Sequence, residues 1–127
     1  MKELTRAEEQ VMQILWRLGK GYINDFLECF PLPKPAYNTV STIVRILEKK
    51  GFIDHEADGK SYIYFPIVSK SDYTKHSMGQ LLNGYFSNSY NQLVSFFAHD
   101  EELTINELEE MKRLIDKQIE NKLRQND

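Results

Sequence analysis

The chain has 127 residues, of which 41% are hydrophobic and 28% charged, and its formal net charge is −3. This composition is typical of one globular domain, or of a small domain with an accessory element, and not of a disordered chain. No apolar run approaches the roughly 20 residues that span a bilayer, and residues 1–5 do not resemble a secretory signal. We therefore expect a cytoplasmic protein. The single cysteine, Cys29, excludes an intramolecular disulfide and a cysteine-rich zinc cage.

Positive charge is concentrated in one short segment. Counting Lys and Arg against Asp and Glu, residues 1–66 carry nine of each, whereas residues 67–127 carry seven against ten. Residues 33–51 contain four cations and only one acid, Glu48. The chain lacks the strongly basic balance of many DNA-binding proteins. A nucleic-acid surface would therefore be local and would rely on hydroxyls, backbone amides and dimerisation for affinity.

Residues 1–35 predict two helices and an extended connection. Thr5 and Glu8 have the spacing of a capping box, which opens a helix that ends at the two glycines of residues 19–21. A short second helix is expected over residues 22–30. Three prolines between residues 31 and 35 then favour an extended segment, because a residue before proline avoids helical geometry.

The third predicted helix, at residues 36–50, has two unlike faces. Its apolar residues recur with helical spacing and form one stripe: Val40, Ile43, Val44 and Leu47. The opposite face carries short hydrogen-bonding side chains and two cations: Asn38, Ser41, Thr42, Arg45 and Lys49. An ordinary solvated face would more naturally use Glu, Lys, Gln and Ala, because Asn, Ser and Thr are poor helix formers. We therefore favour contact with DNA bases and phosphates.

A glycine stop and a hairpin follow this helix. Gly51 is placed to cap the helix, and residues 52–56 and 61–65 read as strands around an Asp58–Gly59 turn. One of the wing tyrosines, Tyr62 or Tyr64, is expected to pack on the sheet. Three helices followed by a hairpin is the order of a winged helix-turn-helix domain, which we assign to residues 1–68.

Residues 69–127 predict a helical dimerisation domain, so the fold class is mainly α with a small β-wing. Ser69 is expected to cap one long fourth helix that includes Phe97, and Thr104 and Glu107 form a capping box for a last helix. This half is too small for a core of its own. Its apolar stripes could form an intramolecular core or bind a different partner, but we favour a second copy of the chain. The predicted interface residues are Leu82, Phe86, Leu93, Phe97, Leu108, Met111, Ile115 and Ile119.

No motif requires an enzyme, a cofactor or a metal. His55, His76 and His99 lack ligand-like spacing and an accompanying carboxylate cluster. The serines lack a matching histidine and aspartate, and a glycine-rich phosphate loop is absent from the sequence. We expect neither catalysis nor a bound cofactor.

Several motifs together resemble the penicillinase-repressor family of bacterial winged-helix transcriptional repressors, and the resemblance covers nearly the whole chain. They are Glu8-x-x-Val11-Met12 with Trp16, residues 39–54, the hairpin sequence at residues 59–64, and residues 93–110. The resemblance implies a homodimer that binds an inverted-repeat operator in double-stranded DNA and blocks transcription, in some members of an antibiotic-resistance-type gene.

In those antibiotic-responsive members, the resemblance further implies a membrane sensor metalloprotease whose signal leads to cleavage of the repressor. The matching bond here joins Phe96 and Phe97. This chain has Phe96 where the family typically has Asn, and it has Ser41 and Ile46 where the antibiotic-responsive members carry basic residues. It also lacks the C-terminal Cys-x-Cys pairs of the copper-responsive members.

These arguments give a set of predicted DNA contacts. Thr39, Thr42 and Arg45 should read bases, and Tyr37, Asn38 and Ser41 lie close enough to help. Phosphate contacts are expected from Asn24, Lys49, Lys50 and Lys60. The alternative is a winged helix used only for contacts with other proteins, without DNA binding.

Overall fold

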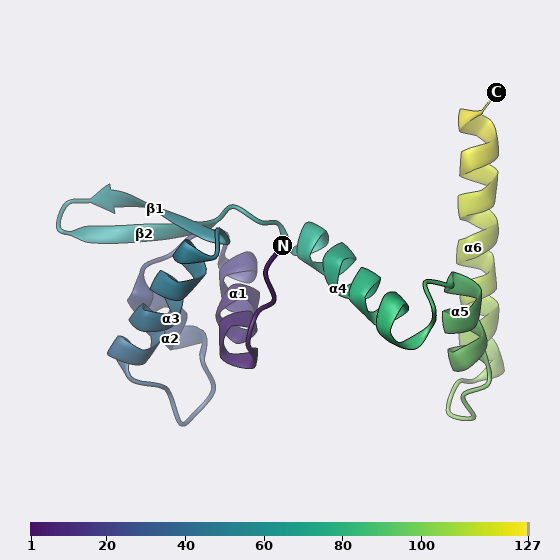
Figure 1. Ribbon diagram of the computed structural model, residues 1–127, viewed down its shortest axis with the longest axis horizontal. Coiled ribbons are helices and arrows are strands. Elements are labelled where there is room, and N and C mark those ends of the chain that lie inside the picture. The colour runs from purple at the N-terminus through teal and green to yellow at the C-terminus, as the bar shows by residue number, and fades with distance from the viewer. Residues whose placement is uncertain (127) are drawn as a thin grey trace. The chain divides into compact units, whose positions relative to one another are not determined.

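The structure, a computed structural model, describes residues 1–126. Along them lie α1 (Arg6–Leu18), α2 (Ile23–Cys29), α3 (Tyr37–Lys49), β1 (Ile53–Asp58), β2 (Ser61–Pro66), α4 (Lys70–Tyr85), α5 (Tyr90–Ala98) and α6 (Ile105–Gln125) (Figure 1). The chain divides into two compact units, Met1–Met78 and a second that begins at Gly79. The predicted fold class, mainly α with a small antiparallel wing, is confirmed.

The first unit folds around the apolar faces of its three helices. α1 opens with the predicted capping box: Thr5 Oγ1 accepts the Glu8 amide at 3.2 Å, and Glu8 Oε1 accepts the Thr5 amide at 3.0 Å. Ile43, which was predicted in the apolar stripe of α3, is only partly buried. The buried core, drawn from α1, α2, α3, the segment before β1, and the hairpin, consists of Val11, Met12, Ile14, Leu15, Ile23, Phe26, Phe30, Val40, Val44, Leu47, Phe52, Ile53 and Tyr64.

The base of the β1–β2 hairpin is tied to the helices. Tyr64 pairs with His55 across the hairpin, and its backbone also exchanges hydrogen bonds of 2.8 and 3.0 Å with Gly21, between α1 and α2. The predicted Asp58–Gly59 turn is wrong by one residue. Asp58 still belongs to β1 and pairs with Ser61, so residues 59 and 60 form the loop. Gly59 has a φ of 61°, and glycine at the first loop position is typical of a type II′ turn, which explains the shift.

The fourth predicted helix is in fact two helices. α4 ends at Tyr85 and α5 begins at Tyr90, because Ser87 and Asn88 adopt left-handed φ angles of 50° and 59°. Ser89 then caps α5, since its Oγ accepts the Gln92 amide at 3.1 Å. The expectation of one continuous helix followed the apolar periodicity and overlooked the Ser-Asn-Ser stop and cap.

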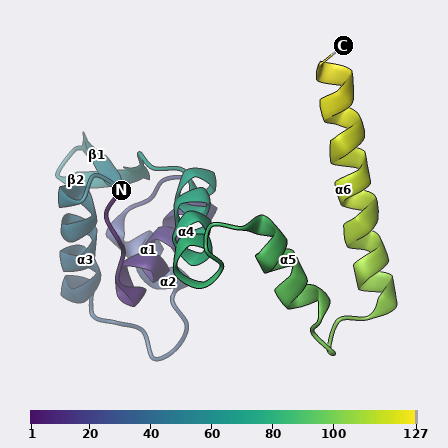
Figure 2. The ribbon, with the colours of Figure 1, turned by 45° about the vertical axis from the view of Figure 1, so that its right-hand side comes forward.

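The second unit contains α5 and α6, which line one groove near the loop that joins them and diverge away from it (Figure 2). α6 begins with the predicted capping box of Thr104 and Glu107. In the single chain, as far as the structure describes it, neither helix has a buried residue. Ile105 and Leu114 are 75% and 61% exposed. One copy of this unit therefore leaves much of its apolar surface in contact with solvent.

The beginning of α4 belongs to the first unit. Ser69 caps α4 as predicted, because its Oγ accepts the Asp72 amide at 3.0 Å. One turn later, the Tyr73 ring packs against the rings of Trp16 and Phe52, with centroid distances of 5.8 Å in both cases. The structure thus divides the chain inside α4, ten residues beyond the end of the winged-helix domain expected from the sequence.

Candidate nucleic-acid interface

One face of α3 is exposed and polar. Asn38, Thr42, Arg45 and Lys49 follow one another at helical spacing, and all four are exposed on the side opposite the buried stripe. Thr42 Oγ1 donates to the Asn38 carbonyl at 2.8 Å, so the hydroxyl oxygen remains free to accept. Neither Arg45 nor Lys49 has an ion-pair partner among residues 1–126. This face therefore offers hydrogen-bonding groups and two unpaired cations to a partner.

The remaining predicted base contacts lie on the flanks of this face. Tyr37 is 50% exposed at the start of α3, and Ser41 is half-buried. Thr39 is exposed but lines a groove together with Pro31 and Pro35 of the preceding loop. Of the predicted base-reading residues, Thr42 and Arg45 are thus the more central and Thr39 is at the edge.

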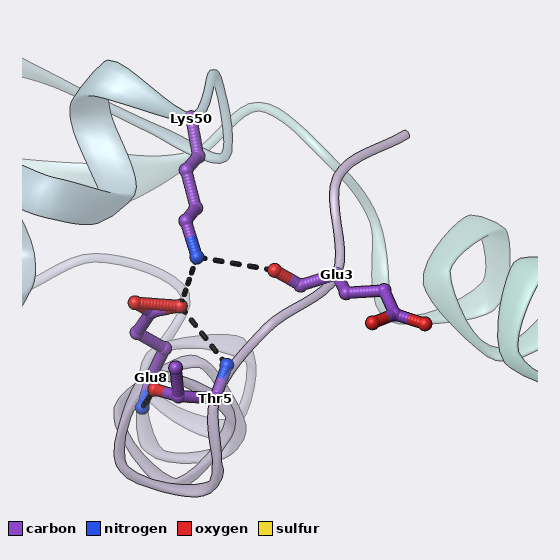
Figure 3. A network of polar contacts seen from close by, with 4 residues as sticks. All are labelled: Glu3, Thr5, Glu8 and Lys50. Carbon is purple, nitrogen blue, oxygen red and sulfur yellow. Dashed lines mark hydrogen bonds and ion pairs between the residues drawn. The ribbon is translucent and has the colours of Figure 1, made fainter.

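Lys50 turns away from this face. Its Nζ lies 2.5 Å from Glu8 Oε1 and 3.1 Å from the Glu3 carbonyl oxygen (Figure 3). Burial alone would raise the pKa of Glu8, but hydrogen bonds from Lys50 and Thr5, with the charge of Lys50, lower that pKa below its usual value. Lys50 therefore joins the end of α3 to α1 and the N-terminal segment. We leave Lys50 out of the proposed phosphate contacts.

The wing packs against α3 through a histidine and a tyrosine. Tyr64 is buried while Tyr62 is 52% exposed, so one of the two packs on the sheet as predicted. His55 Nδ1 lies 2.8 Å from Glu48 Oε1 on α3, and the His55 ring packs at a tilt against Tyr62 with a centroid distance of 4.4 Å. Glu48, the one acid of α3, is therefore engaged by the wing.

Arg45 acts electrostatically on the wing as well. Burial raises the pKa of the Tyr64 hydroxyl, the nearby charge of Glu48 raises it further, and the charge of Arg45 lowers it. The contact that places the wing beside α3 is the one between His55 Nδ1 and Glu48 Oε1.

The start of α2 is held to the end of β1. The Tyr22 hydroxyl donates to the Asp58 carboxylate. This hydrogen bond, followed by burial and the charges of Asp58 and Asp25, raises the pKa of Tyr22. Asn24 is exposed in the first turn of α2, and Lys60 is exposed in the loop after Asp58. Two of the predicted phosphate contacts therefore lie on segments that touch.

Sequence reasoning missed the residues that hold this surface together. Tyr22 and Asp58 are 36 residues apart, and Glu48 and His55 lie on different elements. No local sequence pattern marks such pairs. The sequence did predict a helix that ends at Gly51 and a strand that follows it. That order was the available signal that Glu48 and His55 would approach each other.

The predicted dimerisation residues differ in how far the single chain covers them. Leu82 is 4% exposed, whereas Ile115 and Ile119 are 50% and 52% exposed. The others are half-buried: Phe86, Leu93, Phe97, Leu108 and Met111. Phe97, Leu108, Met111 and Ile115 line a groove of about 420 Å³ between α5 and α6. Phe96 is 71% exposed, and its ring lies 5.6 Å from that of Phe86.

Residues 1–126 contain neither a metal-binding cluster nor a membrane-spanning helix. No group of three or more His, Cys, Asp and Glu side chains in this part of the chain could hold a metal ion. None of the described helices is both long and apolar enough to cross a bilayer.

The first unit is a winged helix-turn-helix domain. Its hairpin follows three helices and is tied to the segment between the first two, and the third helix carries a polar face beside that hairpin. The chain belongs to the penicillinase repressor family, whose model matches residues 4–117. The family resemblance read from the sequence motifs is thereby confirmed.

Two relatives and one solved structure illustrate the similarity. The chain is 31% identical over 116 residues to the methicillin resistance regulatory protein MecI of Staphylococcus aureus strain N315, covering 91% of this chain and 94% of that one. It is 24% identical over 115 residues to the penicillinase repressor of Bacillus licheniformis, covering 90% of each. The DNA-binding domain of the repressor BlaI superposes with a TM-score of 0.49 and 28% identity, over 57% of this chain and 94% of that one. These relatives are named as repressors and a regulator, not as enzymes.

Proposed function

We propose that this protein is a homodimeric transcriptional repressor that binds an inverted-repeat operator in double-stranded DNA. The observation that carries the proposal is the exposed face of α3, where Asn38, Thr42, Arg45 and Lys49 stand together beside the wing. An α-helix fits the major groove. There, Asn can form a bidentate hydrogen bond with adenine, and Arg can form one with guanine. Membership of a family of repressors supports the same reading.

The proposed contacts fall into two kinds. Base contacts come from the centre of the α3 face and its flanks: Tyr37, Asn38, Thr39, Ser41, Thr42 and Arg45. Phosphate contacts come from Asn24, Lys49 and Lys60. The Tyr22–Asp58 and Glu48–His55 pairs hold α2 and the wing in place, so that these contacts meet the duplex as one surface.

The apolar surface of the second unit supports dimerisation. Ile115, Ile119 and Leu123 follow one another on the same side of α6 and are 50%, 52% and 62% exposed in the single chain. Contiguous apolar surface of this kind is favourable to bury against another copy. A two-fold dimer would present two copies of α3 to the two half-sites of an inverted repeat.

Binding to duplex DNA over a range of salt concentrations tests the proposal. The target is a duplex that the protein selects from a random pool, compared with a random duplex. Arg45→Ala should weaken binding to the selected duplex by about 1–3 kcal/mol and affect the random duplex less. Lys60→Ala should weaken both alike. Lys117→Ala changes an exposed lysine on α6 and should alter neither.

A winged helix that contacts only other proteins is the second candidate. The net charge of −3 favours it, as do Asp54, Glu56 and Asp58, which outnumber Lys60 in the hairpin. Phosphate contacts make log affinity fall with log salt by roughly 0.9 per neutralised phosphate. Absence of duplex binding at low salt would overturn the repressor proposal in favour of this alternative.

Regulation by proteolysis is the finer part of the proposal. The names of the relatives support control of an antibiotic-resistance-type gene. A membrane sensor metalloprotease would then act on the Phe96–Phe97 bond of a cytoplasmic repressor. This bond lies in the last turn of α5, a helix without buried residues in the single chain. Cleavage there would detach α6 and with it much of the apolar surface that a dimer would bury.

A further inference from the structure

A concave surface in the first unit has no role in the proposed DNA contacts. An open pocket of about 780 Å³ is lined by α1, the end of α2 and the residues at the junction of β2 and α4, and none of its lining residues belongs to α3. This volume is in the range of small-molecule binding sites. The pocket combines a rigid apolar wall with a cationic one.

The apolar wall is fixed in position. Trp16 Nε1 donates to the Val68 carbonyl at 2.9 Å, and the indole packs against Tyr73, so the ring cannot turn freely. Pro31 and Pro66 also belong to the lining, and proline rings fix the local backbone. A flat apolar ring is the kind of group that such a wall can contact.

The cationic wall has no counter-charge. Arg17 of α1 and Lys70 of α4 line the pocket, and neither has an ion-pair partner among residues 1–126. The amides of Gln10 and Gln13 add hydrogen-bond donors. No Asp or Glu within residues 1–126 lines the pocket, although the chain carries 19 such residues. Two unpaired cations and two amides fit a carboxylate group.

We propose that this pocket binds a small aromatic carboxylate, with its ring on the Trp16 side and its carboxylate between Arg17 and Lys70. The occupant would touch Pro31, in the loop that leads to α3, and Pro66, the last residue of β2. It would therefore contact both segments that connect to the proposed DNA surface. The binding itself does not depend on the DNA-binding proposal.

Two unique residues report on the pocket directly. Trp16 is the only tryptophan and Cys29, also in the lining, is the only cysteine. Benzoate added to the full-length protein should change the tryptophan fluorescence with saturation at about 1–10 mM. It should also slow the alkylation of Cys29 by a neutral reagent. Benzamide, which keeps the ring without the charge, and acetate, which keeps the charge without the ring, should each bind about tenfold more weakly.

Charge-removing variants locate the site. Arg17→Gln and Lys70→Gln should each weaken benzoate binding about tenfold, while benzamide binding stays unchanged. Lys75→Gln, an exposed lysine on α4 outside the lining, is the matched control and should leave benzoate binding unaltered. A fluorescence change that never saturates, benzamide binding as tight as benzoate, or an unchanged benzoate affinity in both variants would each overturn the proposal.

Discussion

The ion pair between Lys50 and Glu8 predicts that one lysine near the proposed DNA surface acts on stability instead of DNA affinity. Lys50→Met keeps most of the side-chain length and removes the charge. Glu8, which is 5% exposed, would keep the Thr5 amide as a donor but lose its cation. A buried carboxylate without a counter-charge is unfavourable, because the protein interior solvates charge poorly.

The expected loss lies between two limits. Removing one partner of a fully buried pair costs about 3–5 kcal/mol, whereas an exposed pair contributes about 0–1 kcal/mol. Glu8 belongs to the first class, but 22% of the Lys50 side chain is exposed, so water can partly replace the ammonium group. We expect a loss of about 2 kcal/mol in the free energy of unfolding, which corresponds to about 8–16 °C in Tm for a unit of this size.

The pH dependence has a definite sign. The pKa of folded Glu8 is lowered, so its ion pair stabilises the fold above the unfolded glutamate pKa of about 4.3. That contribution is lost as the pH falls through the folded pKa. In Lys50→Met, burial remains and the lowering by Lys50 disappears. The difference between the wild type and the variant should therefore be largest near pH 7 and should shrink towards about pH 3.

Urea unfolding followed by tryptophan fluorescence measures this difference, because the sole tryptophan lies in the first unit. Both proteins are compared at equal concentration, since self-association would add to apparent stability. Lys49→Met is the control. Lys49 is exposed and has no ion-pair partner within residues 1–126, so this substitution should change stability by less than about 0.5 kcal/mol. DNA binding should show the opposite pattern. Lys49→Met should reduce the dependence of DNA affinity on salt concentration, whereas Lys50→Met should leave it unchanged. Equal stability of Lys50→Met and wild type would refute the ion-pair reasoning.

Further predictions concern the second unit. The double variant of Leu108→Glu and Met111→Glu places charges in the groove between α5 and α6, so it should sediment as a monomer and lose operator affinity; a persistent dimer would place the interface elsewhere. Ser89→Ala removes the cap of α5 and should destabilise that helix by about 1 kcal/mol, seen as faster amide exchange in α5 alone. In cells exposed to inducer, mass spectrometry should detect a fragment that begins at Phe97; an intact chain during derepression would rule out cleavage between Phe96 and Phe97.

Elements with local signals were predictable from the sequence. The Thr5–Glu8 and Thr104–Glu107 capping boxes and the Ser69 cap all occur as expected, because each depends on residues within one helical turn. The Ser-Asn-Ser sequence that separates α4 from α5 was an equally local signal. The apolar periodicity continued across it, however, and led to the prediction of one helix. Periodicity shows which residues can share a face, but not whether the backbone between them stays helical.

Contacts between distant residues were not predictable in the same way. On a helical wheel Lys49 and Lys50 differ by one position, and both are cations at the end of α3. Only the fold brings Glu8, 42 residues from Lys50, to within 2.5 Å of its Nζ. The same holds for the Tyr22 hydroxyl, which finds Asp58 across the fold. Residue type and helical face therefore identify candidate DNA contacts. Whether a given lysine is free to contact DNA or is engaged in an ion pair depends on tertiary packing.

In the second unit, a single chain does not cover the apolar face of α6. Its apolar residues on α6 follow helical spacing, and the helix forms over Ile105–Gln125, yet Ile119 and Leu123 remain more than half exposed. An amphipathic helix of this length derives most of its stability in proteins from packing of its apolar face. The folding of α6 and the pairing of two copies should therefore be coupled. Dilution should weaken the helix and the operator complex together, since both would depend on the same buried stripe.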